Sequence, residues 1–480
     1  MTRTSALDAA FLQLDSRTSA MHIASLAFFE GPVPKQADIR AAIERKLDRA
    51  PRCRQRLVDV PLALGRPVWV DDHDFDIARH VHRAAVPRPG GTAEVQDVAQ
   101  RLLSEPLDHA APLWEDWILE GLEGGRWALL TKVHHTMVDG IAGTDLLSTL
   151  LDTAAEPGWA PTAVWKPEPA PSTRQLITDA VRDGVALRLS ELAHLPGQVR
   201  DTARSVLRHP GQAVGSLRLT ADGVTGYLLN LRPTPRTTLI GPIGRDRGYA
   251  WTDVDLHRVL AVHDRLGSTV NDHVLAAVTS AFRDLLLARG EEPVPGSLRA
   301  MVPVSVRRPH ERGHFDNRVS TLLVDLPVEL DEPHDRLLEV AVRMRRLKDS
   351  HEAQVGEEVT IVADALPPLP VTAFLHLAFR LPHRNLTTVV TNVPGPSGTL
   401  YLAGRRMLAT YPYVPIADRL RSGIAVTTYA GRLLFGVTTD RDSMPDAQAL
   451  VDGIIRGFDD LAALAGLDPA DGGHERRTGR

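Results

Sequence analysis

The sequence WALLTKVHHTMVDG occupies residues 127–140 and decides the fold. Its first eight residues, Trp127–His134, are mostly apolar and predict a buried strand. Residues Gly140–Leu151 follow with apolar positions at helical spacing and predict an amphipathic helix. A strand that leads through a short polar turn into a helix is typical of α/β proteins, in which side chains at strand ends reach into a cleft.

The turn carries two adjacent histidines, His134 and His135. Neighbouring side chains on a strand point to opposite faces, so we expect one histidine to face the core and the other to face the cleft. A neutral imidazole is suited to take a proton near neutral pH. Asp139 is expected to hold the turn by pairing with an arginine or with backbone donors, and Gly140 lets the chain turn tightly into the helix.

The pair of histidines has two other interpretations. Adjacent histidines at a strand end are often structural, and this interpretation remains open on the motif alone. A metal site is disfavoured, because ligand pairs on one element face the same way, as in H-E-x-x-H, and adjacent strand positions do not.

Composition excludes several classes of protein. The 480 residues carry 55 Lys+Arg against 60 Asp+Glu, a net charge of −5, which gives no overall attraction to nucleic acid. Cys53 is the single cysteine, so neither an internal disulfide nor a cysteine-based metal site is expected. The start of the chain lacks the apolar segment of a signal peptide, and no stretch reaches the roughly 20 apolar residues of a membrane span. A P-loop and a G-x-G-x-x-G fingerprint after a strand are absent.

Apolar periodicity predicts alternating strands and helices in two halves. Further strands are expected at Met21–Phe29, Trp117–Leu119, Leu298–Val306, Val319–Val328, Leu386–Val393 and Leu433–Thr439. Further helices are expected at Asp38–Ala50 with Asp38 as N-cap, Glu94–Leu103, Arg174–Leu207, Asn271–Arg289, His334–Glu352 and Met444–Leu464. Five prolines between residues 156 and 171 indicate a linker. The predicted organisation is an N-terminal domain at 1–155, a Pro-rich linker with connecting helices at 156–238, a C-terminal domain at 239–466 and a mobile tail at 467–480.

Several segments together resemble one family. They are HHTMVDG at 134–140, Pro112-Leu113-Trp114, Asn271-Asp272 at a helix start, Thr391-Asn392 before Val393-Pro394-Gly395-Pro396, and the opening stretch Leu7–Gly31 with Met21-His22. The chain, from about Ser5 to Gly466, resembles the bacterial wax ester synthase/acyl-CoA:diacylglycerol acyltransferases. These belong to the superfamily of CoA-dependent acyltransferases marked by HHxxxDG, which includes chloramphenicol acetyltransferases and the condensation domains of nonribosomal peptide synthetases.

The resemblance implies a fold and a set of site residues. The fold would be α/β, with two chloramphenicol-acetyltransferase-like domains of mixed sheets flanked by helices and the active site in a tunnel at their interface. His135 would be the general base, with His134 and Asp139 completing the catalytic set, and Asp139 would form a structural ion pair with Arg307. The residues expected to border the site are Gly140, Asn271, Asp272, Thr391, Asn392, Pro112, Leu113 and Trp114. Asn271 is also expected to cap its helix.

The implied function is transfer of a fatty acyl group from acyl-CoA to a lipid hydroxyl, giving triacylglycerol from diacylglycerol or a wax ester from a long-chain alcohol. Acyl-CoA would be a cosubstrate, with no metal and no tightly bound cofactor. Two alternatives remain: a condensation-domain-like enzyme that uses a carrier-protein thioester, and a non-catalytic lipid-binding protein on the same fold. The sequence does not define the acceptor, the chain length or the oligomeric state. Because the acceptors are insoluble in water, we expect a cytoplasmic protein that binds the inner membrane face or lipid inclusions peripherally, with Arg174–Arg208 as one candidate surface.

Overall fold

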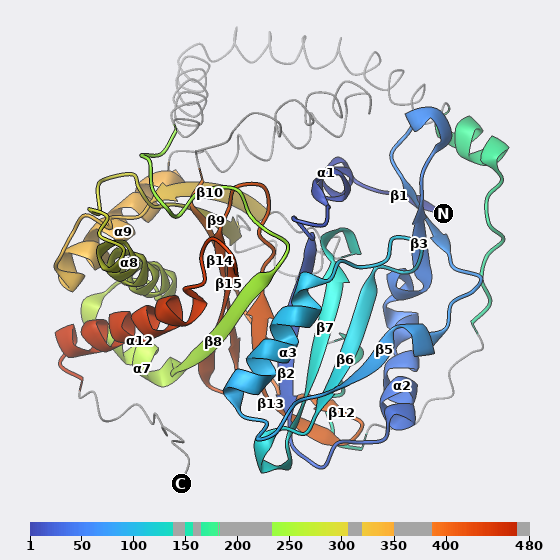
Figure 1. Ribbon diagram of the computed structural model, residues 1–480, viewed down its shortest axis with the longest axis horizontal. Helices are drawn as coiled ribbons and strands as arrows, with labels where there is room; N and C mark the ends of the chain where they lie inside the picture. The colour runs from blue at the N-terminus through green and yellow to red at the C-terminus, as the bar shows by residue number, and fades with distance from the viewer. Residues whose placement is uncertain are drawn as a thin grey trace, which may run out of the picture.

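The computed structural model describes residues 1–137, 149–156, 165–180, 182, 233–305, 319–349 and 386–467. These residues form two six-stranded mixed sheets and a small three-stranded sheet, with helices on the outside (Figure 1). The prediction of an α/β fold with two mixed sheets is therefore confirmed. Within the described residues, no helix is both long and apolar enough to cross a bilayer.

The first large sheet holds the HHxxxDG strand near its centre. Its order is β12 (Tyr401–Leu402), β13 (Arg405–Tyr413), β2 (His22–Phe29), β7 (Trp127–His134), β6 (Trp114–Glu120) and β5 (Val81–Ala85). Helices α2 (Gln36–Glu44) and α3 (Thr92–Ser104) contribute Ile39, Ile43, Val95 and Val98 to the same core as this sheet. Every residue of β7 is buried, which explains its mostly apolar sequence.

The second large sheet has the order β10 (Val319–Asp325), β9 (Arg299–Ser305), β11 (Thr388–Val393), β14 (Ser422–Tyr429), β15 (Arg432–Asp440) and β8 (Arg247–Asp255). Its helices are α7 (Leu256–Leu266), α8 (Val270–Ala288), α9 (Pro333–Asp349) and α12 (Ala447–Leu464). Gly453 and Gly457 of α12 lie directly against Ala281 and Ala277 of α8, so these two helices pack at close range.

Two strands from the C-terminal part of the chain complete the first sheet. β13 pairs antiparallel with β2, with Tyr413 opposite Ala24, and β12 pairs with β13. The phenol of Tyr249, on β8 of the other sheet, donates to the backbone carbonyl of Tyr411 on β13 at 3.0 Å. The crossing between the halves is thus made by β12 and β13, which follow β11 (Thr388–Val393) in the chain.

The small sheet consists of β1 (Thr2–Arg3), β4 (Val68–Asp71) and β3 (Gln55–Val58). Leu176 and Ala180, in the helical residues 173–180, are buried in one cluster with Val60, Val68 and Val70. The described beginning of the segment Arg174–Leu207 therefore packs on its own protein. Most of the rest of that segment, most of the predicted helix Gly140–Leu151 and residues 468–480 of the tail lie outside the described residues.

Two predicted helix caps were wrong. Helix α2 begins at Gln36 after Lys35, whose side chain makes no capping bond, so Asp38 lies inside the first turn. Helix α8 is capped by Thr269, whose hydroxyl accepts the N–H of Asp272 at 3.2 Å while the Asp272 carboxylate accepts the N–H of Thr269 at 2.9 Å. This reciprocal capping box replaces the predicted cap at Asn271.

Candidate active site

The two histidines of the motif are fixed by backbone hydrogen bonds to two other segments. His134 ends β7, and its N–H donates to the carbonyl of Leu113 at 2.9 Å. His135 begins a short 3₁₀ turn, His135–Met137, and its N–H donates to the carbonyl of Met21 at 2.9 Å. The strand therefore stops between the two residues, and the side chains enter different surroundings.

His135 is partly exposed and electrically neutral at neutral pH. Its ring centroid lies 4.0 Å from that of Phe11, on helix α1 (Ala6–Leu14). Burial, together with the nearby ring of His134, lowers the pKa of His135 from 6.5 to about 4. A neutral imidazole has a free nitrogen lone pair, so His135 can accept a proton from a bound substrate.

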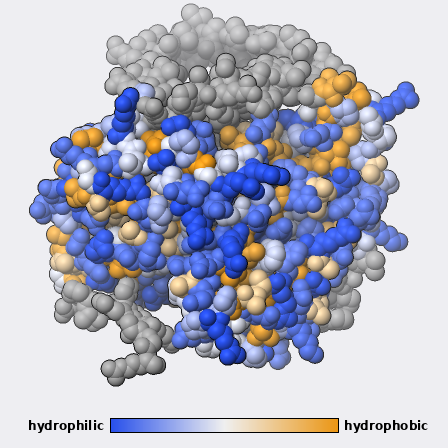
Figure 2. All heavy atoms as spheres, in the orientation of Figure 1, coloured by the Kyte–Doolittle hydropathy of each residue, from blue (hydrophilic) through white to orange (hydrophobic). Residues whose placement is uncertain are grey.

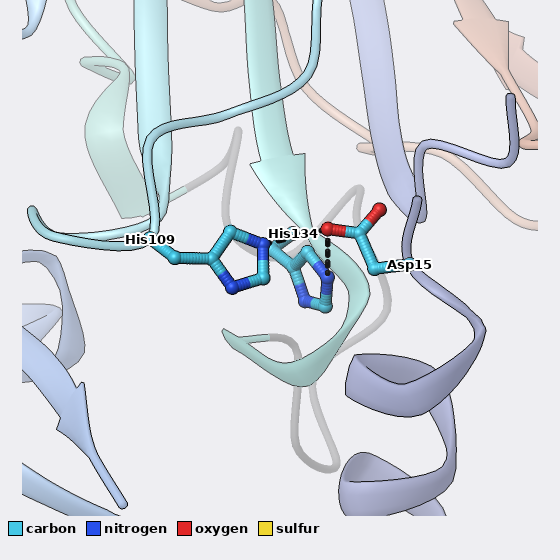
Figure 3. A group of neighbouring side chains, drawn as sticks. All are labelled: Asp15, His109 and His134. Atoms are coloured by element: carbon cyan, nitrogen blue, oxygen red, sulfur yellow. Dashed lines mark hydrogen bonds and ion pairs between the residues drawn. The ribbon is translucent and has the colours of Figure 1, made fainter. Parts of the chain in front are cut away.

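His134 is 1 % exposed and belongs to a polar cluster with Asp15 and His109 (Figure 3). One carboxylate oxygen of Asp15, Oδ2, accepts the Nε2–H of His109 at 2.6 Å and lies 3.7 Å from Nε2 of His134. Its other oxygen, Oδ1, accepts the N–H of Met21 at 2.8 Å. On the opposite edge of the His134 ring, Nδ1 accepts the N–H of Thr136 at 3.2 Å.

The hydrogen bonds of this cluster determine its charges. Burial raises the pKa of Asp15, but the hydrogen bonds from His109 and Met21, together with the nearby ring of His134, outweigh burial and hold that pKa well below its usual range. The hydrogen bond to Asp15 in turn raises the pKa of His109. The cluster is thus built around an ionised carboxylate.

The same three residues have the donor types of a divalent-metal site, and their ligand atoms lie within 4.8 Å of one another. However, the N–H of Thr136 occupies Nδ1 of His134, so the proton of the neutral ring is on Nε2. In this tautomer Nε2 has no lone pair for a metal ion, and the arrangement is that of a hydrogen-bonded cluster.

The segment Pro112-Leu113-Trp114 supports the motif through backbone and packing. All three side chains are buried. Besides the bond from His134 to Leu113, the indole N–H of Trp114 donates to the carbonyl of Cys53 at 2.8 Å, and the indole stacks on His80. These contacts hold the end of β7, which is a structural contribution to the site.

Two segments of the C-terminal half that the sequence singled out lie together. The side-chain amide of Asn392, on β11, donates to the side-chain oxygen of Asn271, at the start of α8, at 3.3 Å. Asn271 and Thr391 are partly exposed, whereas Asp272 is buried in the capping box. Because Thr269 caps the helix, the amide of Asn271 remains available for Asn392.

Other predicted residues lie outside the described part of the chain. These are Asp139 and Gly140 of the motif, and Arg307, the expected partner of Asp139. Conversely, sequence reasoning missed Phe11, Asp15 and His109, which surround the two histidines. No motif or spacing marked these three residues, although Phe11 and Asp15 lie in the opening stretch that carried the family resemblance.

Cys53 provides no nucleophile. Its side chain is 1 % exposed, and burial raises the pKa of its thiol to about 12. Because only the thiolate is strongly nucleophilic, this cysteine is inert at physiological pH.

Comparisons with known proteins cover nearly the whole chain. Residues 4–274 match the model of the wax ester synthase/diacylglycerol acyltransferase catalytic domain, and residues 315–462 match that of the WS/DGAT C-terminal domain. A probable diacylglycerol O-acyltransferase, tgs1, of Mycobacterium tuberculosis is 38 % identical over 97 % of this chain and 96 % of its own length. A putative diacylglycerol O-acyltransferase of Mycobacterium bovis is similar to the same extent.

Solved structures agree with the sequence matches. The wax ester synthase/diacylglycerol acyltransferase of Marinobacter aquaeolei has a TM-score of 0.66 at 26 % identity, covering 97 % of this chain and all of that one. The first condensation domain of the CDA synthetase, at 16 % identity and a TM-score of 0.54, shares the fold. The chain is therefore an acyltransferase that belongs to the wax ester synthase/diacylglycerol acyltransferase family.

Proposed function

We propose that the chain transfers a fatty acyl group from acyl-CoA to the hydroxyl of a neutral lipid, with His135 as the general base. The observation that carries this proposal is the neutral, partly exposed imidazole of His135 at the end of β7, in a chain whose relatives are named diacylglycerol O-acyltransferases. A base that is already neutral needs no prior loss of a proton before the acceptor binds.

In this mechanism the acceptor hydroxyl gives its proton to His135 as its oxygen attacks the thioester carbonyl of acyl-CoA. The tetrahedral intermediate then collapses, the carbon–sulfur bond breaks, and the CoA thiolate takes the proton back from His135. The reaction exchanges one thioester for one oxygen ester, without an acyl-enzyme. Asp139 would hold the turn that carries His135, and the pair of Asn271 and Asn392 would border the site from the C-terminal half.

Product analysis tests this function. Purified protein is given radiolabelled palmitoyl-CoA with either dioleoylglycerol or hexadecanol, and the lipids are separated. We expect labelled triacylglycerol, labelled wax ester or both, together with one free CoA per ester formed. Release of CoA and free fatty acid, with no ester from either acceptor, would contradict the proposal. Transfer only to the thiol or amine of a carrier-protein substrate would favour a condensation-type enzyme instead.

We also propose that the enzyme collects its acceptor from a lipid surface through an exposed apolar loop. Apolar residues gather at the upper right of the molecule, above the region of β1 and β3 (Figure 2). The loop η3 (Pro61–Ala63) lies between β3 and β4, and Leu62 and Leu64 are 82 % and 38 % exposed. Leu62 also has a φ of +59°, a strained conformation that is common at functional loops.

Liposome flotation tests this loop. Replacing Leu62 and Leu64 by glutamate should abolish binding to vesicles of phosphatidylglycerol and dioleoylglycerol. Leu287→Glu, on α8, changes a leucine that is 51 % exposed elsewhere and should leave binding unchanged. Equal binding of both variants would exclude the loop as the contact, and failure of the native protein to float would exclude peripheral binding to this surface.

A further inference from the structure

The carboxylate of Asp15 faces the ring of His134 (Figure 3) and accepts the N–H of Met21, whose carbonyl in turn accepts the N–H of His135. We infer that Asp15 is a positioning residue, which fixes the ring state of His134 and the place of His135 without touching substrate. The inference rests on the proposed role of His135 as the base.

The first route from Asp15 runs through the tautomer of His134. A backbone N–H can only donate, so the bond from Thr136 leaves Nδ1 of His134 without a proton. The proton of the neutral ring is then on Nε2, which faces Asp15 Oδ2 at 3.7 Å. Nε2 is buried and has no hydrogen-bond partner within the geometric limits among the described residues, so the negative charge of Asp15 is what favours a proton there.

The second route runs through Met21. The N–H of Met21 donates to Asp15 Oδ1 at 2.8 Å, and the carbonyl of Met21 accepts the N–H of His135 at 2.9 Å. One peptide residue therefore connects the carboxylate to the backbone of the proposed base. If Asp15 no longer holds Met21, the acceptor that fixes His135 can shift.

A third contact comes from the helix that Asp15 ends. The N–H of Asp15 donates to the carbonyl of Phe11 at 3.0 Å as the C-cap of α1, and the ring of Phe11 lies against the ring of His135. The last turn of α1 thus supplies one side chain to each histidine. The carboxylate also bonds Met21, directly before β2, and through Met21 it is connected to the turn after β7.

These contacts predict a specific defect in Asp15→Asn. The amide oxygen can still accept the N–H of Met21, but its NH₂ group would face two ring N–H groups, those of His109 and His134. Donors that face each other repel, so His134 should move its proton to Nδ1 and lose the bond from Thr136. Thr136 lies in the turn that carries His135, so losing its bond to His134 should misplace the proposed base while the substrate contacts stay intact. We therefore expect kcat to fall roughly tenfold to a hundredfold with KM unchanged.

The experiment combines kinetics with the ring state of His134. Steady-state kcat and KM are measured for Asp15→Asn, His135→Ala and the double variant, and the protonated ring nitrogen of His134 is identified by long-range ¹H–¹⁵N correlation. Asp8→Asn is the matched control. Asp8 forms the capping box with Ser5 at the other end of α1, so this variant weakens the same helix without changing the Asp15 carboxylate. We expect kcat to fall in Asp15→Asn but not in Asp8→Asn. The proton of the His134 ring should be on Nε2 in the native protein and on Nδ1 in Asp15→Asn. Adding Asp15→Asn to His135→Ala should cause no further loss of kcat.

Native kcat in Asp15→Asn with the proton still on Nε2 would overturn the inference, as would an equal loss of kcat in Asp8→Asn. A further loss in the double variant would show that Asp15 acts independently of His135 and would also overturn it. Full activity of His135→Ala would instead overturn the proposed function, and the ring state of His134 would then decide by itself whether Asp15 orients that histidine.

Discussion

The side chains of Asn392 and Asn271 are hydrogen-bonded at 3.3 Å although 121 positions separate them. This bond joins the strand β11 to the first turn of α8, and both segments were assigned to the border of the site. If the pair acts as a unit, replacing either residue by alanine should remove the same interaction. We predict that Asn271→Ala and Asn392→Ala each lower kcat/KM about tenfold and that the double variant is no worse than either. Losses that multiply in the double variant would show that the two residues act separately.

Asp116 should make the protein less stable as pH rises. It is 1 % exposed, and burial raises the pKa of its carboxyl to about 7, with the hydrogen bond from Thr131 opposing the shift. In the unfolded chain this carboxyl ionises near pH 4. Its contribution to stability is therefore greatest below pH 4 and is lost progressively as pH rises to about 7.

The variant Asp116→Asn should remove this loss, because an amide stays neutral. We expect the free energy of unfolding to rise relative to the native protein on the order of 2 kcal/mol at pH 8, and by less at pH 5. Urea denaturation at both pH values measures the difference, with the exposed Asp335→Asn as control. A variant that is less stable at pH 8 than the native protein would contradict the raised pKa of Asp116.

Gly436 should be essential to the crossing between the two halves. A Cβ atom at this residue of β15 would lie 1.6 Å from the carbonyl oxygen of Pro412 on β13, a backbone atom that cannot rotate away. Gly436→Ala should therefore push the strands apart and destabilise the fold on the order of 3 kcal/mol. At Gly398 a Cβ would meet nothing within 4 Å, so Gly398→Ala is the matched control. Equal urea midpoints for the two variants would contradict this close packing.

Parts of the fold were predictable from sequence because their signals are local. Strand Trp127–His134 was predicted with the bounds that the structure has, since its residues are all buried and therefore all apolar or paired. The caps of α2 and α8 were not, because each helix begins before the polar residue predicted to cap it. Asp38 and Asn271 therefore lie in the first turn, and Thr269 caps α8.

The other features that the sequence did not predict depend on contacts between residues far apart in the chain. Nothing in the residues of β13 indicates that its partner is β2, whose sequence lies more than 370 positions earlier. The same limit applies to the candidate site. His134 and His135 are recognisable in the sequence as part of a motif. Asp15 and His109 come from two segments far apart in the sequence and lie together only in the folded chain.

The low pKa of His135 predicts an unusual dependence of activity on pH. The base must be neutral to accept a proton, and burial lowers its pKa to about 4, so the neutral form persists far below pH 6.5. We expect kcat/KM to change little between pH 8 and pH 5.5 and to fall only as pH approaches 4. Circular dichroism at each pH separates this titration from unfolding. A fall to half the maximal kcat/KM near pH 6.5, in folded protein, would indicate a base with an ordinary histidine pKa.

In the proposed mechanism His135 moves the proton, and the turnover of His135→Ala measures how much of the rate depends on it. The measurement is the rate of CoA release from palmitoyl-CoA with dioleoylglycerol and with hexadecanol, beside the control His334→Ala, an exposed histidine on α9. We expect His135→Ala to keep the melting temperature of the native protein and to lose at least about a hundredfold in kcat with both acceptors, while His334→Ala keeps the native rate. A folded His135→Ala protein that forms ester at a rate close to the native one would show that His135 is not the base.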